Sequence, residues 1–123
     1  QQWELGTMPP HSIALTAHAT VVSRRDGAAV LDAGSKVLGA DRAAYATGYG
    51  RLLDHPEARI TALSEHHATV TFPTGAAIPA LGEVLRVVPN HVCNAVNLVD
   101  ELSVERDGLE VGAWAVAARG RNS

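Results

Sequence analysis

Alternation between apolar and polar side chains over residues 13–23 is the feature that most restricts the fold of this chain. One set of alternate positions holds Ile, Leu, Ala, Ala and Val, and the other holds Ala, Thr, His, Thr and Val. Side chains on a strand point alternately to opposite faces, so this segment predicts a long strand with one apolar face. Asp26-Gly27 follows as a turn, and residues 28–32 predict the second strand of a hairpin.

Short segments with the same character continue along the chain. Residues 36–46 are ambiguous and favour at most one short helical turn, while Gly48 and Gly50 predict a permissive loop around Tyr49. About seven strands with at most one short helix predict a mainly β fold, a small antiparallel barrel or sandwich. The five further strands are predicted at residues 59–63, 67–72, 83–88, 102–106 and 109–117.

Composition restricts the class of protein. The 123 residues are 46% hydrophobic, which predicts a single domain over residues 1–123 with its own core. The net charge of −3 without a basic block argues against a nucleic-acid partner, and no apolar run approaches the ~20 residues that span a membrane. One cysteine excludes an internal disulfide and favours the cytoplasm. Because the chain begins at Gln1 without Met and ends abruptly, we expect it to be part of a longer protein.

The stretch PNHVCNAVNL at residues 89–98 places the only cysteine two positions after a histidine. If this stretch is extended, His91 and Cys93 point to the same face. Sulfur and imidazole nitrogen suit Zn²⁺ better than Mg²⁺ or Ca²⁺, and two ligands leave open positions, as in a catalytic site. The alternative is a buried free cysteine beside a hydrogen-bonded histidine. Asn94 and Asn97 are candidates to orient the ligands, or are turn-forming residues.

Two other clusters carry polar side chains. Asp32 and Lys36 flank Ala-Gly-Ser, a pattern that suits either an anion bound by backbone N–H groups and an ammonium or a surface ion pair. Glu65 and His67 would share one face of a strand, near a pocket or at an exposed strand end.

Five stretches together resemble the C-terminal domain of the D-serine dehydratase / D-threonine aldolase family, whose members are pyridoxal phosphate (PLP) enzymes of alanine-racemase-like fold. The stretches keep the family's order and cover most of the chain. They are ALTAHATVVSR (residues 14–24), LDAGSKVL (31–38), LSEHH (63–67), VVPNHVCNAVNL (87–98) and AVAARGR (115–121).

The resemblance implies an N-terminal (β/α)₈ barrel, absent from this chain, that holds PLP and its lysine. This chain would pack on that barrel, in a homodimer with a shared active site. His91 and Cys93 would be the ligands of Zn²⁺, or of Mn²⁺, with no other catalytic or PLP-binding residue in this chain. The aldolase type often has Asp at the second position, so Cys93 favours the dehydratase. LSEHH departs from the more usual LSEEH of the family, with His66 in place of a carboxylate.

The chemistry implied by the resemblance is β-elimination on a D-β-hydroxy-amino acid such as D-serine, giving a 2-oxo acid and ammonia. PLP would be the electron sink, and the metal would bind the substrate hydroxyl. The alternatives are retro-aldol cleavage of D-threonine type, a racemase domain, or a non-catalytic dimerisation domain. Because the barrel lysine is absent, the chain alone is predicted to be inactive.

Overall fold

The computed structural model describes residues 1–121 and confirms the predicted mainly β fold. Within these residues, eight strands and two short α-helices follow a 3₁₀ turn at Pro10–Ser12. The helices are α1 (Ser35–Leu38) and α2 (Val92–Val96). The strands are β1 (Ala17–Arg25), β2 (Ala28–Leu31), β3 (Gly50–Leu52), β4 (Arg59–Leu63), β5 (Ala68–Thr71), β6 (Val84–Pro89), β7 (Glu101–Arg106) and β8 (Leu109–Ala115).

Beyond shifts of one or two residues at strand ends, the secondary structure differs from the prediction in three places. β1 begins at Ala17, four residues later than expected. β3 occupies part of the predicted glycine loop, because its hydrogen bonds come from β6, far along the chain. Residues 92–96 form α2, so the prediction of an extended segment through Cys93 is wrong. Residues 1–121 contain two short α-helices rather than one at most.

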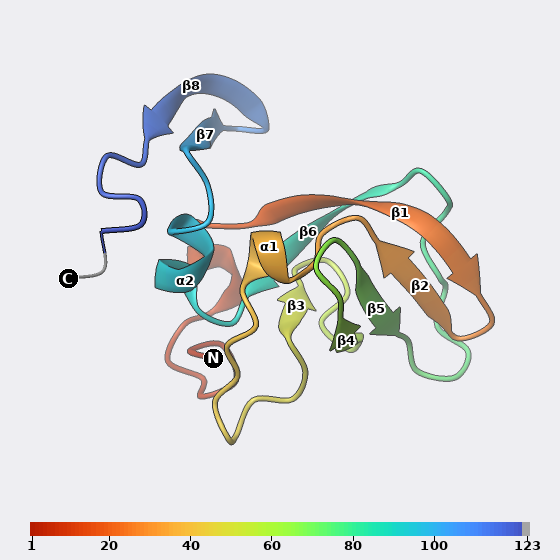
Figure 1. The fold of residues 1–123 in the computed structure, drawn as a ribbon. Helices are drawn as coiled ribbons and strands as arrows, with labels where there is room; N and C mark the ends of the chain where they lie inside the picture. Colours follow the sequence, from red (N-terminus) through yellow and green to blue (C-terminus); the bar gives the residue numbers. More distant parts are fainter. Residues whose placement is uncertain (122–123) are drawn as a thin grey trace.

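Six strands form one antiparallel sheet in the order β3-β6-β1-β2-β5-β4, which curls into a nearly closed barrel (Figure 1). The two edges approach each other, since β3 contacts β4 and the Tyr49 N–H donates to the Ile60 carbonyl at 3.0 Å. β7 and β8 form a separate hairpin that lies apart from the barrel (Figure 1).

Two glycines allow the edges to come this close. A Cβ on Gly48 would lie 2.6 Å from the Ile60 carbonyl oxygen of β4. One on Gly50 would lie 3.3 Å from the Ile60 Cδ1 atom and 2.8 Å from the Val88 carbonyl oxygen of β6, the strand that pairs with β3. Both have positive φ, +93° and +149°, which glycine adopts without steric cost. We call this contact of residues 48–50 with Ile60 the seam.

The barrel interior is built from aliphatic side chains, as the alternation in β1 predicts. Ala19 and Val21 are buried, whereas His18 and Val22 are exposed. Fully burying a Leu, Ile or Val contributes about 1.5–3 kcal/mol to folding. The largest fully buried side chains are Leu31, Leu38, Leu52, Ile60, Val21, Val70 and Val87.

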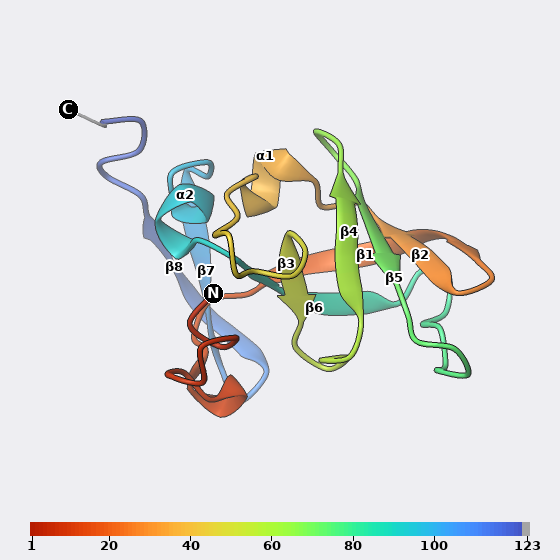
Figure 2. The same ribbon diagram turned by 90° about the horizontal axis from the view of Figure 1, so that it is seen from below.

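The two helices lie at one end of the barrel. α1 follows β2, α2 follows β6, and the two are in contact (Figure 2). This end therefore carries the segments that contain the predicted site residues. No helix in residues 1–121 is long and apolar enough to cross a membrane.

Because the seam has no room for a side chain at Gly48, we expect one added methyl group there to lower the free energy of unfolding by an unusually large amount. Gly48→Ala should destabilise the chain by about 1–2 kcal/mol for the positive φ and by about 1–3 kcal/mol more for the clash with the Ile60 carbonyl. Gly75→Ala is the matched control, because its φ of +81° is similar and nothing lies within 4 Å of its added Cβ. Urea unfolding of both variants measures the difference, and equal losses would show that the seam has room for a side chain.

Candidate metal site

His91 and Cys93 lie where β6 ends and α2 begins. The strand ends at Pro89, which has no N–H to continue the ladder, and His91 is the extended N-cap residue of α2. Cys93 is inside the helix, where each residue turns the side chain by about 100°, so the argument from strand alternation does not apply to this pair. Both side chains are exposed, which is contrary to the alternative of a buried cysteine. Soft sulfur and imidazole nitrogen are therefore both accessible to a metal.

A carboxylate that the sequence did not reveal contacts His91. The Nδ1 atom of His91 lies 2.6 Å from the Oδ2 atom of Asp41, in the loop of residues 39–49 between α1 and β3. Asp41 was missed because it lies 50 positions away in the chain and belongs to no motif. Among the residues that the structure describes, no cluster of three or more His, Cys, Asp or Glu side chains is arranged to hold a metal.

Asn90 ties this loop to the end of β6. Its Nδ2 atom donates to the carbonyls of Asp41 (3.1 Å) and Gly48 (3.0 Å). The loop carrying Asp41 is thus held beside His91 by the residue that precedes His91.

A buried arginine holds the far end of the same loop. Arg51 of β3 donates to the Thr47 carbonyl and, at 2.6 Å, to the Thr47 hydroxyl, and it pairs with Glu4. Burial lowers the pKa of the Arg51 guanidinium, with a smaller contribution from Arg59. These contacts fix the loop at the point where it enters the seam.

The two asparagines predicted to orient the ligands have other contacts in the structure. The Asn94 side chain packs against Gly39, where an added Cβ would lie 2.6 Å from its Nδ2 atom. The Oδ1 atom of Asn97 accepts a hydrogen bond from the Gly120 N–H at 2.7 Å. Asn94 therefore joins α2 to the end of α1, and Asn97 joins α2 to the C-terminal segment.

The other two predicted clusters meet each other. The Lys36 ammonium lies 2.8 Å from the Glu65 carboxylate, so the ion pair forms with Glu65 rather than Asp32. The Ser35 and Lys36 N–H groups donate to the Ser64 and Glu65 carbonyls at 2.9 and 3.1 Å, which uses the groups expected to bind an anion.

The remaining members of these clusters have local roles. Asp32 accepts from the Thr20 N–H at 2.6 Å, and the His67 N–H donates to the Ser64 hydroxyl at 3.2 Å. Residues 64–67 form the turn between β4 and β5, so the prediction that Glu65 and His67 share one face of a strand is wrong. The His67 side chain is exposed in this turn.

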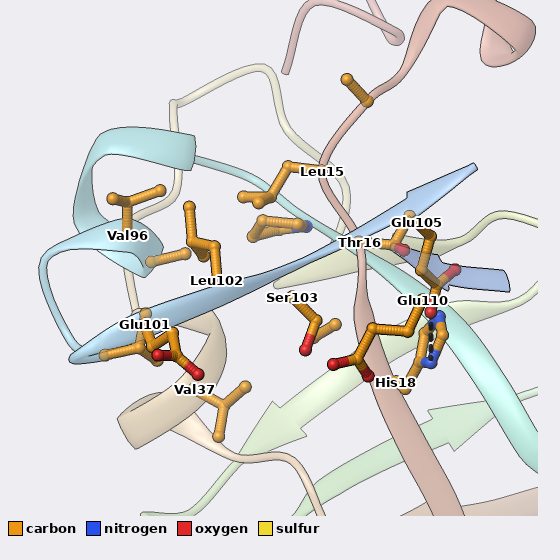
Figure 3. A pocket seen from close by; sticks show the side chains of 15 residues that line it. Leu15, Thr16, His18, Val37, Val96, Glu101, Leu102, Ser103, Glu105 and Glu110 are labelled. Carbon is orange, nitrogen blue, oxygen red and sulfur yellow. Dashed lines mark ion pairs between the residues drawn. The ribbon is translucent and has the colours of Figure 1, made fainter. Parts of the chain in front are cut away.

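A cavity of about 420 Å³ lies between the segment before β1, α2 and the β7–β8 hairpin (Figure 3). His18 and Glu105 face each other there, with 3.8 Å between Nδ1 and Oε1, and Glu101 and Glu110 also line it. None of the predicted site residues is among its lining residues, so this cavity is not the site that the sequence predicts.

Comparison with known proteins assigns the class of this β domain. Residues 14–105 match the sequence family described as "Putative serine dehydratase domain", and the chain belongs to this family. An uncharacterized protein of Mycobacterium tuberculosis (strain H37Rv) is 58% identical over 127 residues, which cover 99% of this chain and 96% of that protein. D-threonine aldolase of an Arthrobacter species is 39% identical over 103 residues, which cover 83% of this chain and 26% of the enzyme.

Solved structures agree with this assignment. D-threonine aldolase from Filomicrobium marinum superimposes with a TM-score of 0.76 at 34% identity, over 88% of this chain and 29% of the enzyme. D-threo-3-hydroxyaspartate dehydratase from Delftia sp. HT23 shares the fold, with a TM-score of 0.73 at 24% identity over 93% of this chain and 35% of the enzyme. The chain thus spans about a third of these solved structures.

The two hydrogen bonds of Asn90 predict that this side chain holds the loop of residues 39–49 in place. Asn90→Ala removes two hydrogen bonds and should lower the free energy of unfolding by about 1–2 kcal/mol, while amide exchange in residues 40–49 becomes faster. Urea unfolding and hydrogen-exchange mass spectrometry measure the two effects. Asn97→Ala is the control, because it should speed exchange in the segment around Gly120 instead. Unchanged exchange in residues 40–49 would contradict the role of Asn90.

Proposed function

We propose that this chain is the metal-bearing C-terminal domain of a PLP-dependent lyase that acts on D-β-hydroxy-amino acids by β-elimination, as a D-serine dehydratase does. The observation that carries the proposal is the exposed His91–Cys93 pair at the start of α2, in a chain that belongs to the serine dehydratase domain family.

The donor set fits a Zn²⁺ ion. His91 would bind through Nε2, since its Nδ1 atom is engaged by Asp41, and Cys93 would bind as the thiolate. Structures of D-threo-3-hydroxyaspartate dehydratase include a histidine-to-alanine variant and a metal-free cysteine-to-alanine variant, and the two positions differ by two. His91 and Cys93 have the same spacing. Mn²⁺ is less suited to a thiolate ligand, so Zn²⁺ is preferred.

Two ligands from this chain leave coordination positions for substrate. A cation held there supplies Lewis-acid polarisation of a hydroxyl oxygen, which makes hydroxide a better leaving group. His91 and Cys93 would thus bind and orient the β-hydroxyl end of the amino acid, while the loop of residues 39–49 holds the imidazole in place.

The rest of the active site would come from an N-terminal PLP barrel domain, where PLP supplies the electron sink for Cα chemistry. Exposed apolar side chains on β8 support a covering partner: Leu109, Val111 and Trp114 are 70%, 56% and 68% exposed. We assign the cover of these side chains to the barrel domain. The proposal includes a homodimer with a shared active site and a cytoplasmic location, where the Cys93 thiol stays reduced.

Retro-aldol cleavage is the second candidate reaction. It is favoured by the two D-threonine aldolases that are 39% and 34% identical to this chain. Cys93 and the family's description favour dehydration. A cation at the β-oxygen would assist either reaction by polarising that oxygen, so the same two ligands would serve either one.

The metal site gives the first test. The chain should bind Zn²⁺ in calorimetry, and Co²⁺ with a thiolate charge-transfer band, because Cys93 is a ligand. Cys93→Ala should abolish the band, and both Cys93→Ala and His91→Ala should weaken binding at least tenfold. His67→Ala is the control, since it removes an exposed imidazole elsewhere. Unchanged affinity in both ligand variants would refute the proposed metal site.

Activity is measured with the barrel domain present. D-serine should give pyruvate and ammonia, with loss of at least a hundredfold in rate after chelation or in Cys93→Ala. Glycine and acetaldehyde from D-threonine would indicate the aldolase instead, and L-serine from D-serine would indicate a racemase. Full activity in both chelator and Cys93→Ala would exclude a catalytic metal, and no activity on any of these substrates would favour a non-catalytic dimerisation domain. The chain alone should be inactive.

A further inference from the structure

The contact between Asp41 and His91 restricts the chemistry of the imidazole. An ionised carboxylate only accepts hydrogen bonds, so the ring nitrogen 2.6 Å from it, Nδ1, carries a proton. In a neutral ring the lone pair is then on Nε2. Histidine ligands of metals commonly donate their second N–H to a carboxylate or carbonyl, which fixes the tautomer and the ring orientation.

The stability that this contact supplies is small. The side chains of Asp41 and His91 are 51% and 47% exposed, and an ion pair this exposed contributes little to folding stability. Stabilisation of the fold therefore does not account for the Asp41–His91 contact. Orientation of the His91 ring does, because it requires only that the Asp41 carboxylate be held in place.

The loop is built to be such a fixed partner. Asn90 donates to the backbone carbonyl of Asp41 itself, and the Arg42 guanidinium lies over the Tyr49 ring, 5.2 Å from its centre. These contacts restrain the backbone at the carbonyl of Asp41 and at the next residue, which keeps the Asp41 carboxylate beside His91.

We propose that Asp41 is a positioning residue that holds His91 as the Nδ1–H tautomer and presents its Nε2 atom to the metal. The inference deepens the proposed function, because it assumes that His91 is a metal ligand. Asp41 itself does not touch the metal or the substrate.

Nitrogen NMR of the histidine rings in the 123-residue chain tests the tautomer without any metal or activity. His91 should have its proton on Nδ1 in the unsubstituted chain and lose this fixed state in Asp41→Ala. Asp41→Asn should preserve part of it, because the amide oxygen can accept the same hydrogen bond. An unchanged His91 tautomer in Asp41→Ala would overturn the inference.

Metal affinity tests the consequence. Asp41→Ala should weaken Zn²⁺ and Co²⁺ binding about 10- to 100-fold, as loss of a histidine's carboxylate partner does elsewhere, with Asp41→Asn in between. Asp54→Ala is the matched control: it removes a carboxylate of similar exposure, 48%, that pairs with Arg86. This control separates positioning from the general effect of one lost negative charge.

The outcomes distinguish the two proposals. If Cys93→Ala weakens metal binding but Asp41→Ala binds as tightly as Asp54→Ala, the role of Asp41 is wrong and the metal site stands. If His91→Ala and Cys93→Ala both leave metal binding unchanged, the proposed metal site is wrong. If the unsubstituted chain binds no metal, the tautomer measurement alone decides whether Asp41 controls the ring.

Discussion

Closure of the barrel at the seam is the constraint on which the functional end of the molecule depends. The six-stranded sheet has two edges, and exposed edges would leave backbone groups unpaired. Gly48 and Gly50 let β3 come within hydrogen-bonding distance of β4, so the Tyr49 N–H finds the Ile60 carbonyl. Any side chain at Gly48 would meet that carbonyl first. The seam therefore sets where the preceding loop, residues 39–49, can lie.

The candidate site follows from this closure by a short series of contacts. The Gly48 carbonyl, at the seam, accepts from the Asn90 side chain, which also holds the Asp41 carbonyl. Asn90 follows β6, the strand that pairs with β3, and directly precedes His91. Two segments far apart in sequence thus meet because both are attached to one strand pair. The Asp41–His91 contact is a product of the fold rather than of local sequence.

The difference between contacts set by local sequence and contacts set by the fold explains which features could be predicted from the sequence. β2 and β8 were predictable because each follows a short turn next to its partner, where alternation and Asp-Gly are local signals. β3 was missed because three residues gain strand geometry only by pairing with β6. Cys93 was misplaced because α2 is five residues long, too short for a periodic pattern to show it. Asp41 had no local signal, whereas His91 and Cys93 were predicted as metal ligands from their residue types, their spacing and the family resemblance.

On the proposed function, a site with two protein ligands at the end of a domain would link metal binding to assembly with the barrel domain. A tetrahedral Zn²⁺ ion needs four ligands, and the described residues hold no cluster of three. On the proposed function, the remaining positions are filled by water, substrate or the barrel domain. Loss of any of these ligands would lower the affinity of the site for the metal. The partner domain and the substrate would thus add binding energy to that supplied by His91 and Cys93. Fixing the His91 ring before the metal binds would then raise the metal affinity more than it would in a closed four-ligand site. With only two protein ligands, the entropy lost in ordering each one is a larger part of the binding free energy.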